Sequence, residues 1–248
     1  MGIKNVLSII GRGVREIAYP NDIKCIVCDG ELSADNIYGV CLRCKLERNL
    51  SYCLACGRAI DSLATFCNDC ATIDRAFESS RAPVVVSGGV HKVVHALKYG
   101  GAKWLVPYIV EYMLDCVSLE YGWEYDVIVP VPLHPKRQRE RGYNQSELLA
   151  AELGRRLKVE CRGSVIERIK HTEYLARMSR LERAAAIEGA FEVLDQAAIR
   201  GKRILLVDDV FTTGATVSEC AKTLKKNRGA NRVYVLTFAT GRISVPLV

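Results

Sequence analysis

The sequence has no apolar run long enough to cross a membrane. A spanning helix needs about 18–20 consecutive apolar residues, and the 248 residues contain no such run. The apolar stretch at residues 5–10 lacks the length and the flanking residues of a signal peptide. We therefore expect no membrane span and a cytoplasmic protein.

Two common phosphate-binding signatures are also missing. The sequence contains neither the P-loop pattern G-x-x-x-x-G-K-[ST] nor the dinucleotide fingerprint G-x-G-x-x-G. Histidine is scarce, and none of the four histidines falls in the cysteine-rich N-terminal region. A phosphate site is therefore expected in another kind of loop, and a metal site near the N-terminus is expected to use thiolates.

Cysteine, by contrast, is abundant. Eight of the 11 cysteines form four C-x-x-C pairs, which are Cys25 and Cys28, Cys41 and Cys44, Cys53 and Cys56, and Cys67 and Cys70. A secreted disulfide scaffold would be short and would follow a signal peptide, whereas paired thiols in a reducing compartment are typical metal ligands. Two pairs make a tetrahedral S₄ site that suits structural Zn²⁺. Two zinc ions are therefore expected.

The spacing of the pairs favours sequential sites but leaves a second arrangement open. Twelve residues separate the first two pairs and ten separate the last two, as expected for two zinc knuckles, 25/28/41/44 and 53/56/67/70. An interleaved arrangement would join 25/28 with 53/56. The other three cysteines, Cys116, Cys161 and Cys220, stand among apolar residues and are predicted to be small buried hydrophobes.

The positive charge is concentrated in one segment. The net charge is +7, yet residues 1–80 hold nine Lys and Arg against ten Asp and Glu. Residues 134–183 hold thirteen against seven. Such a surplus indicates an anionic partner, namely phosphate, pyrophosphate or nucleic acid, although solvated helix faces are the alternative. The balanced cysteine-rich region argues against strong phosphate binding there.

Three zones are predicted along the chain. Residues 1–22 have the spacing of an amphipathic lead-in, residues 23–72 form a small cysteine-rich zinc module, and residues 82–248 alternate between strand and helix patterns. Strands are predicted at 83–87, 125–131, 190–194, 203–207 and 233–238, and helices at 91–99, 104–117, 144–157 and 217–228. This alternation predicts an α/β fold with a doubly wound parallel sheet.

The sharpest signal lies at residues 203–216, where an apolar strand leads into two acids and a loop of small residues. The carboxylates of Asp208 and Asp209 can accept hydrogen bonds from a ribose diol or hold Mg²⁺ through water. The loop that follows can bind phosphate through N–H groups at a helix N-terminus and through hydroxyls. Its residues are Thr212, Thr213, Gly214, Ala215 and Thr216.

A second signal is the basic stretch within residues 126–145. A buried strand runs into a predicted loop that contains Lys136, Arg137, Arg139 and Arg141. The planar guanidinium group suits phosphate oxygens. Beside a ribose-phosphate site, this stretch is a candidate for binding pyrophosphate or DNA.

Both segments resemble known families. Residues 203–216 resemble the phosphoribosyl-diphosphate (PRPP) signature of type I phosphoribosyltransferases, which implies that the two acids bind the ribose hydroxyls and the loop binds the 5′-phosphate. Residues 126–145 and 96–100 resemble the ComF family, in which a double zinc ribbon precedes a phosphoribosyltransferase domain and whose members are linked to DNA uptake in natural transformation. The resemblance covers nearly the whole chain and adds Lys98 to the pyrophosphate or DNA candidates.

One segment departs from the family pattern. Residues 162–190 correspond to the hood over the substrate, and Leu175 and Ala186 stand where the family favours Gln and Asn. Three functions therefore stay open. The first is a Mg²⁺-dependent transferase that uses PRPP, releases pyrophosphate and has an unnamed acceptor. The second is a non-catalytic sensor of PRPP or nucleotides. The third is an accessory protein that handles single-stranded DNA beside other DNA-uptake proteins.

Overall fold

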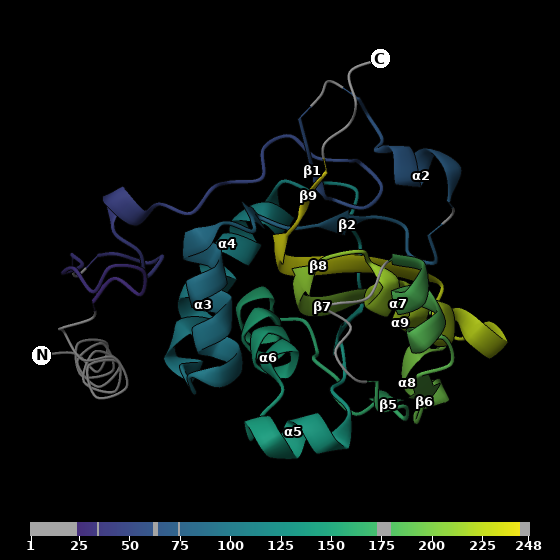
Figure 1. Cartoon of the computed structure of the whole chain (residues 1–248). Helices are drawn as coiled ribbons and strands as arrows, with labels where there is room; N and C mark the ends of the chain where they lie inside the picture. The colour runs from purple at the N-terminus through teal and green to yellow at the C-terminus, as the bar shows by residue number, and fades with distance from the viewer. Residues whose placement is uncertain (1–23, 34, 62–63, 74, 173–179, 244–248) are drawn as a thin grey trace, which may run out of the picture.

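A parallel sheet forms the centre of the molecule (Figure 1). The computed structural model describes residues 24–33, 35–61, 64–73, 75–172 and 180–243. The predicted lead-in at 1–22 and Leu175 of the hood lie outside these residues. The sheet has five strands in the order β2-β8-β7-β4, with β3 also paired to β8. They are β2 (Ser80–Arg81), β3 (Val84–Val85), β4 (Val127–Pro130), β7 (Arg203–Phe211) and β8 (Arg232–Thr240).

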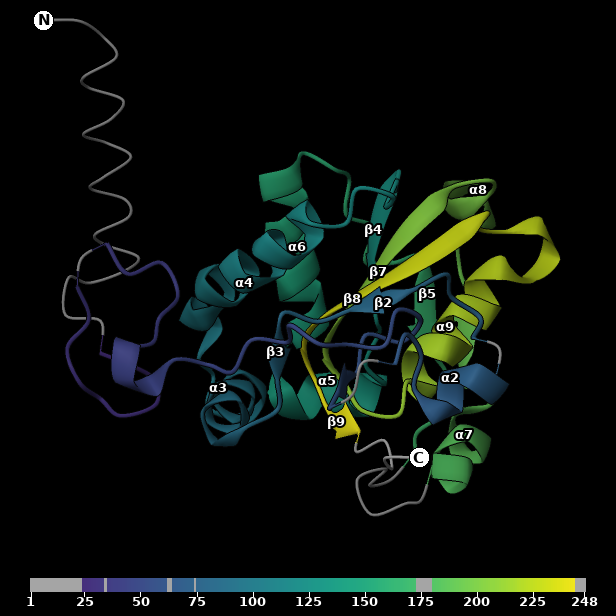
Figure 2. The ribbon, with the colours of Figure 1, turned by 90° about the horizontal axis from the view of Figure 1, so that it is seen from above.

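Helices cover both faces of this sheet, because its central strands are apolar on both sides. On β7, Leu205 and Val207 pack into one core, whereas Ile204 and Leu206 pack into the other. A strand buried on both faces belongs in a parallel sheet with two helical layers. Figure 2 shows the two layers, which are α3 (Gly88–Tyr99), α4 (Val106–Ser118) and α6 (Gln145–Leu157) on one side, and α9 (Ala215–Lys225) with α7 (Arg180–Ile187) on the other.

The cysteine-rich region is divided between the two faces. Cys25 and Leu46 pack into the core under α3, α4 and α6, whereas Cys53, Cys56 and Ile60 pack into the core under α9. The part of this region that contains Cys53 and Cys56 also contacts the C-terminal part of the chain, because β1 (Ala59–Ile60) pairs in parallel with β9 (Arg242–Ile243). A short helix, α2 (Asn68–Thr72), follows β1 in the chain. The predicted domain boundary between residues 72 and 82 stays a prediction. Each of the two apolar cores contains residues from both sides of it.

The remaining elements are short. They are the 3₁₀ helices Leu42–Cys44, Lys103–Leu105 and Lys226–Arg228, the helices α5 (Pro135–Arg141) and α8 (Gln196–Ile199), and the strands β5 (Ile166–Arg168) and β6 (Phe191–Val193). None of the helices in the described ranges is long and apolar enough to cross a membrane.

Three expectations about local structure need correction. The loop predicted for the basic stretch is the helix α5, because the His134 side chain caps it, Pro135 opens it, and Gly142 ends it with a φ of 79°. The strand predicted at 190–194 is β6, which pairs antiparallel with β5 outside the main sheet. Strand β7 continues past the acid pair to Phe211, because it stays paired with β8 that far.

Candidate functional site

A pocket of about 340 Å³ lies where β4 and β7 end and α3, α6 and α9 come together. Its wall combines three kinds of surface. Valines of α3 and the residues that follow β4 make an apolar side. The acid pair and two threonines of the following loop make a polar side, and basic side chains close the rest. Of the predicted site residues, the pocket is lined by Lys98, Arg137, Asp208, Asp209, Thr212 and Thr216.

The acid pair is held by side chains of α6. The hydroxyl of Ser146 donates to Oδ1 of Asp208 at 2.7 Å, and Nε2 of Gln145 donates to Oδ1 of Asp209 at 3.3 Å. The N–H of Asp209 also donates to Oδ1 of Asp208 at 2.9 Å. Both helix residues are buried, so these contacts fix the direction of the carboxylates before any ligand arrives.

Lys98 of α3 forms an ion pair with the inner carboxylate. Its Nζ lies 2.5 Å from Oδ2 of Asp209, whose side chain is 5% exposed. Burial alone would raise the pKa of Asp209, but the charge and hydrogen bond of Lys98 outweigh it and lower that pKa. For Asp208, burial and the charge of Asp209 outweigh the more distant charge of Lys98 and raise the pKa to about 7.

The two acids therefore differ in what they offer a ligand. Carboxylate oxygens are the ligands that Mg²⁺ prefers. Lys98 already engages Oδ2 of Asp209, so Asp208 is the acid that fits a Mg²⁺ ion or a ribose hydroxyl more directly.

The loop after β7 makes a tight turn into α9. Gly214 has a φ of 80°, and a Cβ at this position would come within 2.4 Å of the Phe211 ring. Only glycine fits such a position without strain. The turn leaves Thr212 exposed and Thr213 half-buried, and it places Thr216, in the first turn of α9, in the pocket lining. The start of a helix favours a bound anion. Thr213, Gly214 and Ala215 shape this turn but do not line the pocket.

Two arginines of the pocket lining bond to the same residue. Nη2 of Arg137 donates to the carbonyl oxygen of Thr172 at 3.3 Å, and the guanidinium of Arg168 bonds to the hydroxyl of the same residue. Arg168 is 6% exposed, and burial together with the charge of Arg137 lowers its pKa. Two guanidinium groups in one wall favour an anion between them.

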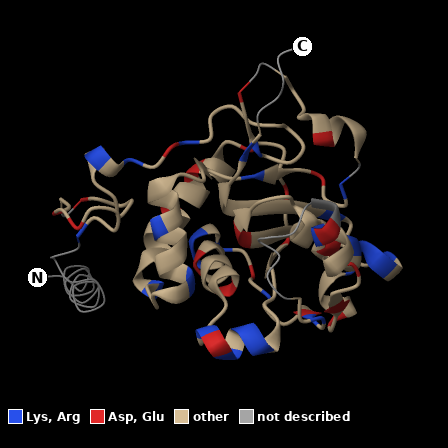
Figure 3. Cartoon of the chain, in the orientation of Figure 1, with Lys and Arg blue, Asp and Glu red and all other residues tan. Residues whose placement is uncertain are grey.

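The rest of the predicted basic group points elsewhere. Lys136 and Arg139 are exposed on α5, whose basic residues are visible in Figure 3. Arg141 bonds to the side chain of Gln145 and lies over the ring of Tyr99 at 5.1 Å. The structure therefore brings Arg137 and Lys98 into the pocket and leaves the other three outside its lining.

Four polar or charged lining residues were not predicted from the sequence. They are His91 on α3, Gln145 and Ser146 on α6, and Arg168 on β5. Gln145 stands at the end of the basic stretch, directly after the helix cap Asn144, so its position next to a recognisable site was the available signal. Arg168 has no such neighbour, because it reaches the pocket only through the β5–β6 pair.

The eight paired cysteines form two separate groups. In each, the four sulfur atoms lie within 4.8 Å of one another, and the groups are 25/28/41/44 and 53/56/67/70. The structure thus has the sequential arrangement rather than the interleaved one. Tetrahedral zinc with a Zn–S bond of about 2.3 Å requires sulfur atoms about 3.8 Å apart. The distances of 3.7 Å from Cys28 to Cys41 and 3.8 Å from Cys56 to Cys67 fit this requirement.

Of the three unpaired cysteines, which were predicted to be buried, one is buried and two are partly buried. Cys220 is fully buried, and Cys116 and Cys161 are partly buried against the core. Burial raises the pKa of Cys116 to about 12 and that of Cys161 to about 11. Such thiols are inert packing residues.

Comparison with known proteins agrees with this fold. A family model described as "Phosphoribosyl transferase domain" matches residues 143–246, and one described as "PHF5-like protein" matches residues 7–98. With the parallel sheet and the two Cys₄ groups, these matches confirm the predicted fold class, a sheet of the type I phosphoribosyltransferase type preceded by a cysteine-rich module.

Similar whole proteins are found among curated sequences. Competence protein F of Haemophilus influenzae is 28% identical over 83% of this chain and 92% of its own length. DNA utilization protein YhgH of Salmonella typhimurium is 28% identical over 85% and 94%. Competence protein ComFC of Bacillus subtilis is 26% identical over 86% and 93%. The similarity therefore extends over nearly the full length of each relative.

Proposed function

The chain belongs to the ComF family, and from that premise we propose that it binds PRPP with Mg²⁺ and transfers ribose 5-phosphate with release of pyrophosphate. The pocket is the observation that supports this most strongly. It combines a preoriented acid pair, a loop at a helix N-terminus and two arginines within about 340 Å³.

Each part of PRPP has a matching surface. The ribose diol fits Asp208 and Asp209, which α6 holds in place. The 5′-phosphate fits the loop from Thr212 to Thr216, where α9 begins. The pyrophosphate fits Arg137 and Arg168, since guanidinium groups bind phosphate oxygens through paired hydrogen bonds. The apolar wall made by α3 leaves space for an uncharged acceptor.

The proposed reaction needs stabilisation of charge more than covalent help. As the bond between C1 of ribose and the pyrophosphate oxygen lengthens, negative charge collects on the departing group. Arg137 and Arg168 would hold that group and offset its charge. Mg²⁺ bound with PRPP would supply further positive charge to it. Asp208 and Asp209 would keep the sugar in place while C1 is attacked.

Measuring turnover of PRPP distinguishes a transferase from a non-catalytic sensor. The protein is incubated with PRPP, Mg²⁺ and a panel of nucleobases, and released pyrophosphate is measured. Release that depends on one acceptor supports the transferase. Tight PRPP binding without release under any acceptor would favour the non-catalytic sensor of PRPP or nucleotides.

The arginine pair gives a first prediction. Replacing Arg137 by Gln is expected to weaken PRPP binding by about 10- to 100-fold, because one charge-assisted hydrogen bond contributes about 1.5–3 kcal/mol. Binding of ribose 5-phosphate, which lacks pyrophosphate, is expected to stay unchanged. Arg139→Gln is the matched control, since Arg139 is exposed on the same helix and does not line the pocket. Equal losses in both variants would contradict the assignment.

A second candidate function is the handling of single-stranded DNA together with other DNA-uptake proteins. Two observations favour it. The helix α5 carries four basic residues at the edge of the pocket, two of them exposed (Figure 3). The relatives are named for competence and for DNA utilization.

The DNA function predicts a salt effect. Changing Lys136, Arg137, Arg139 and Arg141 to Ala is expected to weaken binding of single-stranded DNA and to flatten the slope of log K against log salt by up to about 3. The control removes four other charges, those of Lys222, Lys225, Lys226 and Arg228. Unchanged DNA binding in the α5 variant would contradict a role of α5 in binding DNA. A variant that lacks residues 1–72 would not show whether the zinc module binds DNA. Cys25 and Cys53 are part of the two apolar cores, so the deletion would also disturb folding.

A further inference from the structure

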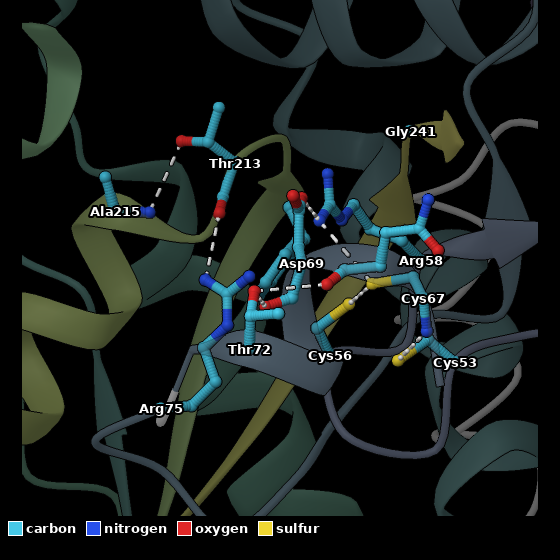
Figure 4. A network of polar contacts seen from close by, with 12 residues as sticks. Cys53, Cys56, Arg58, Cys67, Asp69, Thr72, Arg75, Thr213, Ala215 and Gly241 are labelled. Carbon is cyan, nitrogen blue, oxygen red and sulfur yellow. Dashed lines mark hydrogen bonds and ion pairs between the residues drawn. The ribbon is translucent and has the colours of Figure 1, made fainter. Parts of the chain in front are cut away.

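One side chain connects the second Cys₄ group to the phosphate loop. Arg75 lies five positions after Cys70, and its Nη1 donates to the carbonyl oxygen of Thr213 at 3.2 Å, as Figure 4 shows. The two residues are 138 positions apart in the sequence. The contact therefore joins the cysteine-rich region directly to the loop that is proposed to bind the 5′-phosphate.

The rest of the Arg75 guanidinium is buried, five positions after the last cysteine of the second Cys₄ group. Its Nε and Nη2 are buried and have no hydrogen-bond partner among the described residues. A Zn²⁺ ion bound by four thiolates has a net charge of −2, so a neighbouring cation is favoured. Arg58 is a second such cation, which bonds to Asp69 and donates to Sγ of Cys67 at 3.8 Å.

The carbonyl that Arg75 holds determines the direction of a phosphate donor. In a trans peptide the C=O and the following N–H point in opposite directions, and the described chain has no cis peptide bond. Fixing the Thr213 carbonyl toward Arg75 therefore turns the N–H of Gly214 the other way. Gly214 is the N-cap of α9, so this N–H lies at the end of the helix where an anion is favoured.

We propose that Arg75 is a positioning residue, which the chain connects directly to the second Cys₄ group and which sets the Thr213–Gly214 peptide for phosphate binding. The proposal rests on the proposed function of the loop and adds a dependence on the second Cys₄ group. It makes this group part of the phosphate site rather than a separate structural module.

A purely structural role for Arg75 makes a different prediction. The same region also packs against the end of β7 just before the loop, because Phe77 is 3% exposed and meets the Phe211 ring edge-on at 6.1 Å. Phe77→Leu loosens this packing and leaves the Arg75 contact with Thr213 intact. It is therefore the matched control for Arg75→Met, which keeps a long side chain but removes the donor.

The test measures ribose 5-phosphate binding by calorimetry in the full chain, with zinc content and Tm as controls. Arg75→Met is expected to bind about tenfold more weakly, whereas Phe77→Leu with a comparable loss of Tm is expected to bind like the parent protein. Hydrogen exchange of a peptide spanning residues 212–218 is expected to rise in Arg75→Met alone. Parental affinity and parental exchange in Arg75→Met would overturn the proposal.

The outcome also separates this inference from the function on which it rests. If the parent protein does not bind ribose 5-phosphate, the assignment of the phosphate loop fails. Hydrogen exchange in the loop still reports whether Arg75 positions the peptide. If the parent binds and Arg75→Met binds equally well with unchanged exchange, the positioning role fails and the site assignment stands.

Discussion

Replacing Cys53 and Cys56 together by Ser is expected to release one zinc ion per chain and to unfold much of the protein. All of Cys53, Cys56 and Cys67 are fully buried in the core under α9. Structural zinc contributes about 10–16 kcal/mol in isolated zinc-finger peptides, which is comparable to the whole stability of a typical domain. The variant is therefore expected to lose its cooperative thermal transition and to contain one zinc ion per chain, whereas the parent is expected to contain two.

Metal analysis and thermal melting check this prediction. The matched comparison is Cys28→Ser, because Cys28 is the exposed member of the first group and its loss leaves no buried cavity. A milder loss of Tm is expected there. A protein that contains almost no zinc and stays folded after chelation would contradict the structural role of both sites.

Replacing Asp208 and Asp209 by Asn is expected to abolish most PRPP affinity. Asparagine keeps the size of the side chain and removes the charge that engages the ribose diol and Mg²⁺. Charged hydrogen bonds of this kind make the expected loss about 2–4 kcal/mol, which corresponds to a loss of about 30- to 1,000-fold in affinity. Ribose 5-phosphate would still be attracted weakly through the loop that begins at Thr212.

The ion pair of Lys98 shapes the design of this experiment. Asp209→Asn alone would leave the amine of Lys98 beside an uncharged amide, and an unpaired buried charge costs about 3–5 kcal/mol of stability. The variant therefore includes Lys98→Gln. The matched control carries Asp209→Asn with Lys98→Gln and keeps Asp208, because Lys98→Gln alone would leave the buried Asp209 carboxylate unpaired. Calorimetry measures PRPP binding, with thermal melting as the folding control. A variant that binds PRPP as the parent does would show that the site assignment is wrong.

The part of the site that sequence reasoning predicted is the part that is contiguous in the chain. The acid pair and the loop from Thr212 to Thr216 stand together after one apolar strand, so their pattern is visible without a structure. The partners of the acids come from 62 and 64 positions away, at Ser146 and Gln145. Arg75 and Arg168 reach the site through tertiary contacts that no local pattern reports.

The helical state of the basic stretch was missed for a different reason. Four basic side chains and several prolines suggested a phosphate-binding loop. The sequence nevertheless contains the residues that begin and end a helix there. A capping side chain at His134, a proline at the first helical position and glycine at 142 are sufficient to start and stop one short helix. The helix then separates Arg137, which lines the pocket, from Lys136 and Arg139, which do not.

The division of the cysteine-rich region also needed the structure. The spacing of the C-x-x-C pairs predicted two sequential sites, and the sulfur positions agree. The apolar residues beside them are what place the two groups on opposite faces of the sheet. Leu46 packs into the core under α3, α4 and α6, and Ile60 packs into the core under α9. The sequence around these two residues does not indicate which core each one joins.

The most direct test of the account is a calorimetric titration of the parent protein with PRPP in the presence of Mg²⁺. We expect one saturable site per chain, with affinity at least about tenfold higher than for ribose 5-phosphate, because PRPP also engages Arg137 and Arg168. The Asp208→Asn, Asp209→Asn, Lys98→Gln variant is expected to show little of this heat. No saturable binding of PRPP to folded parent protein that contains zinc would contradict the account and would favour the handling of single-stranded DNA.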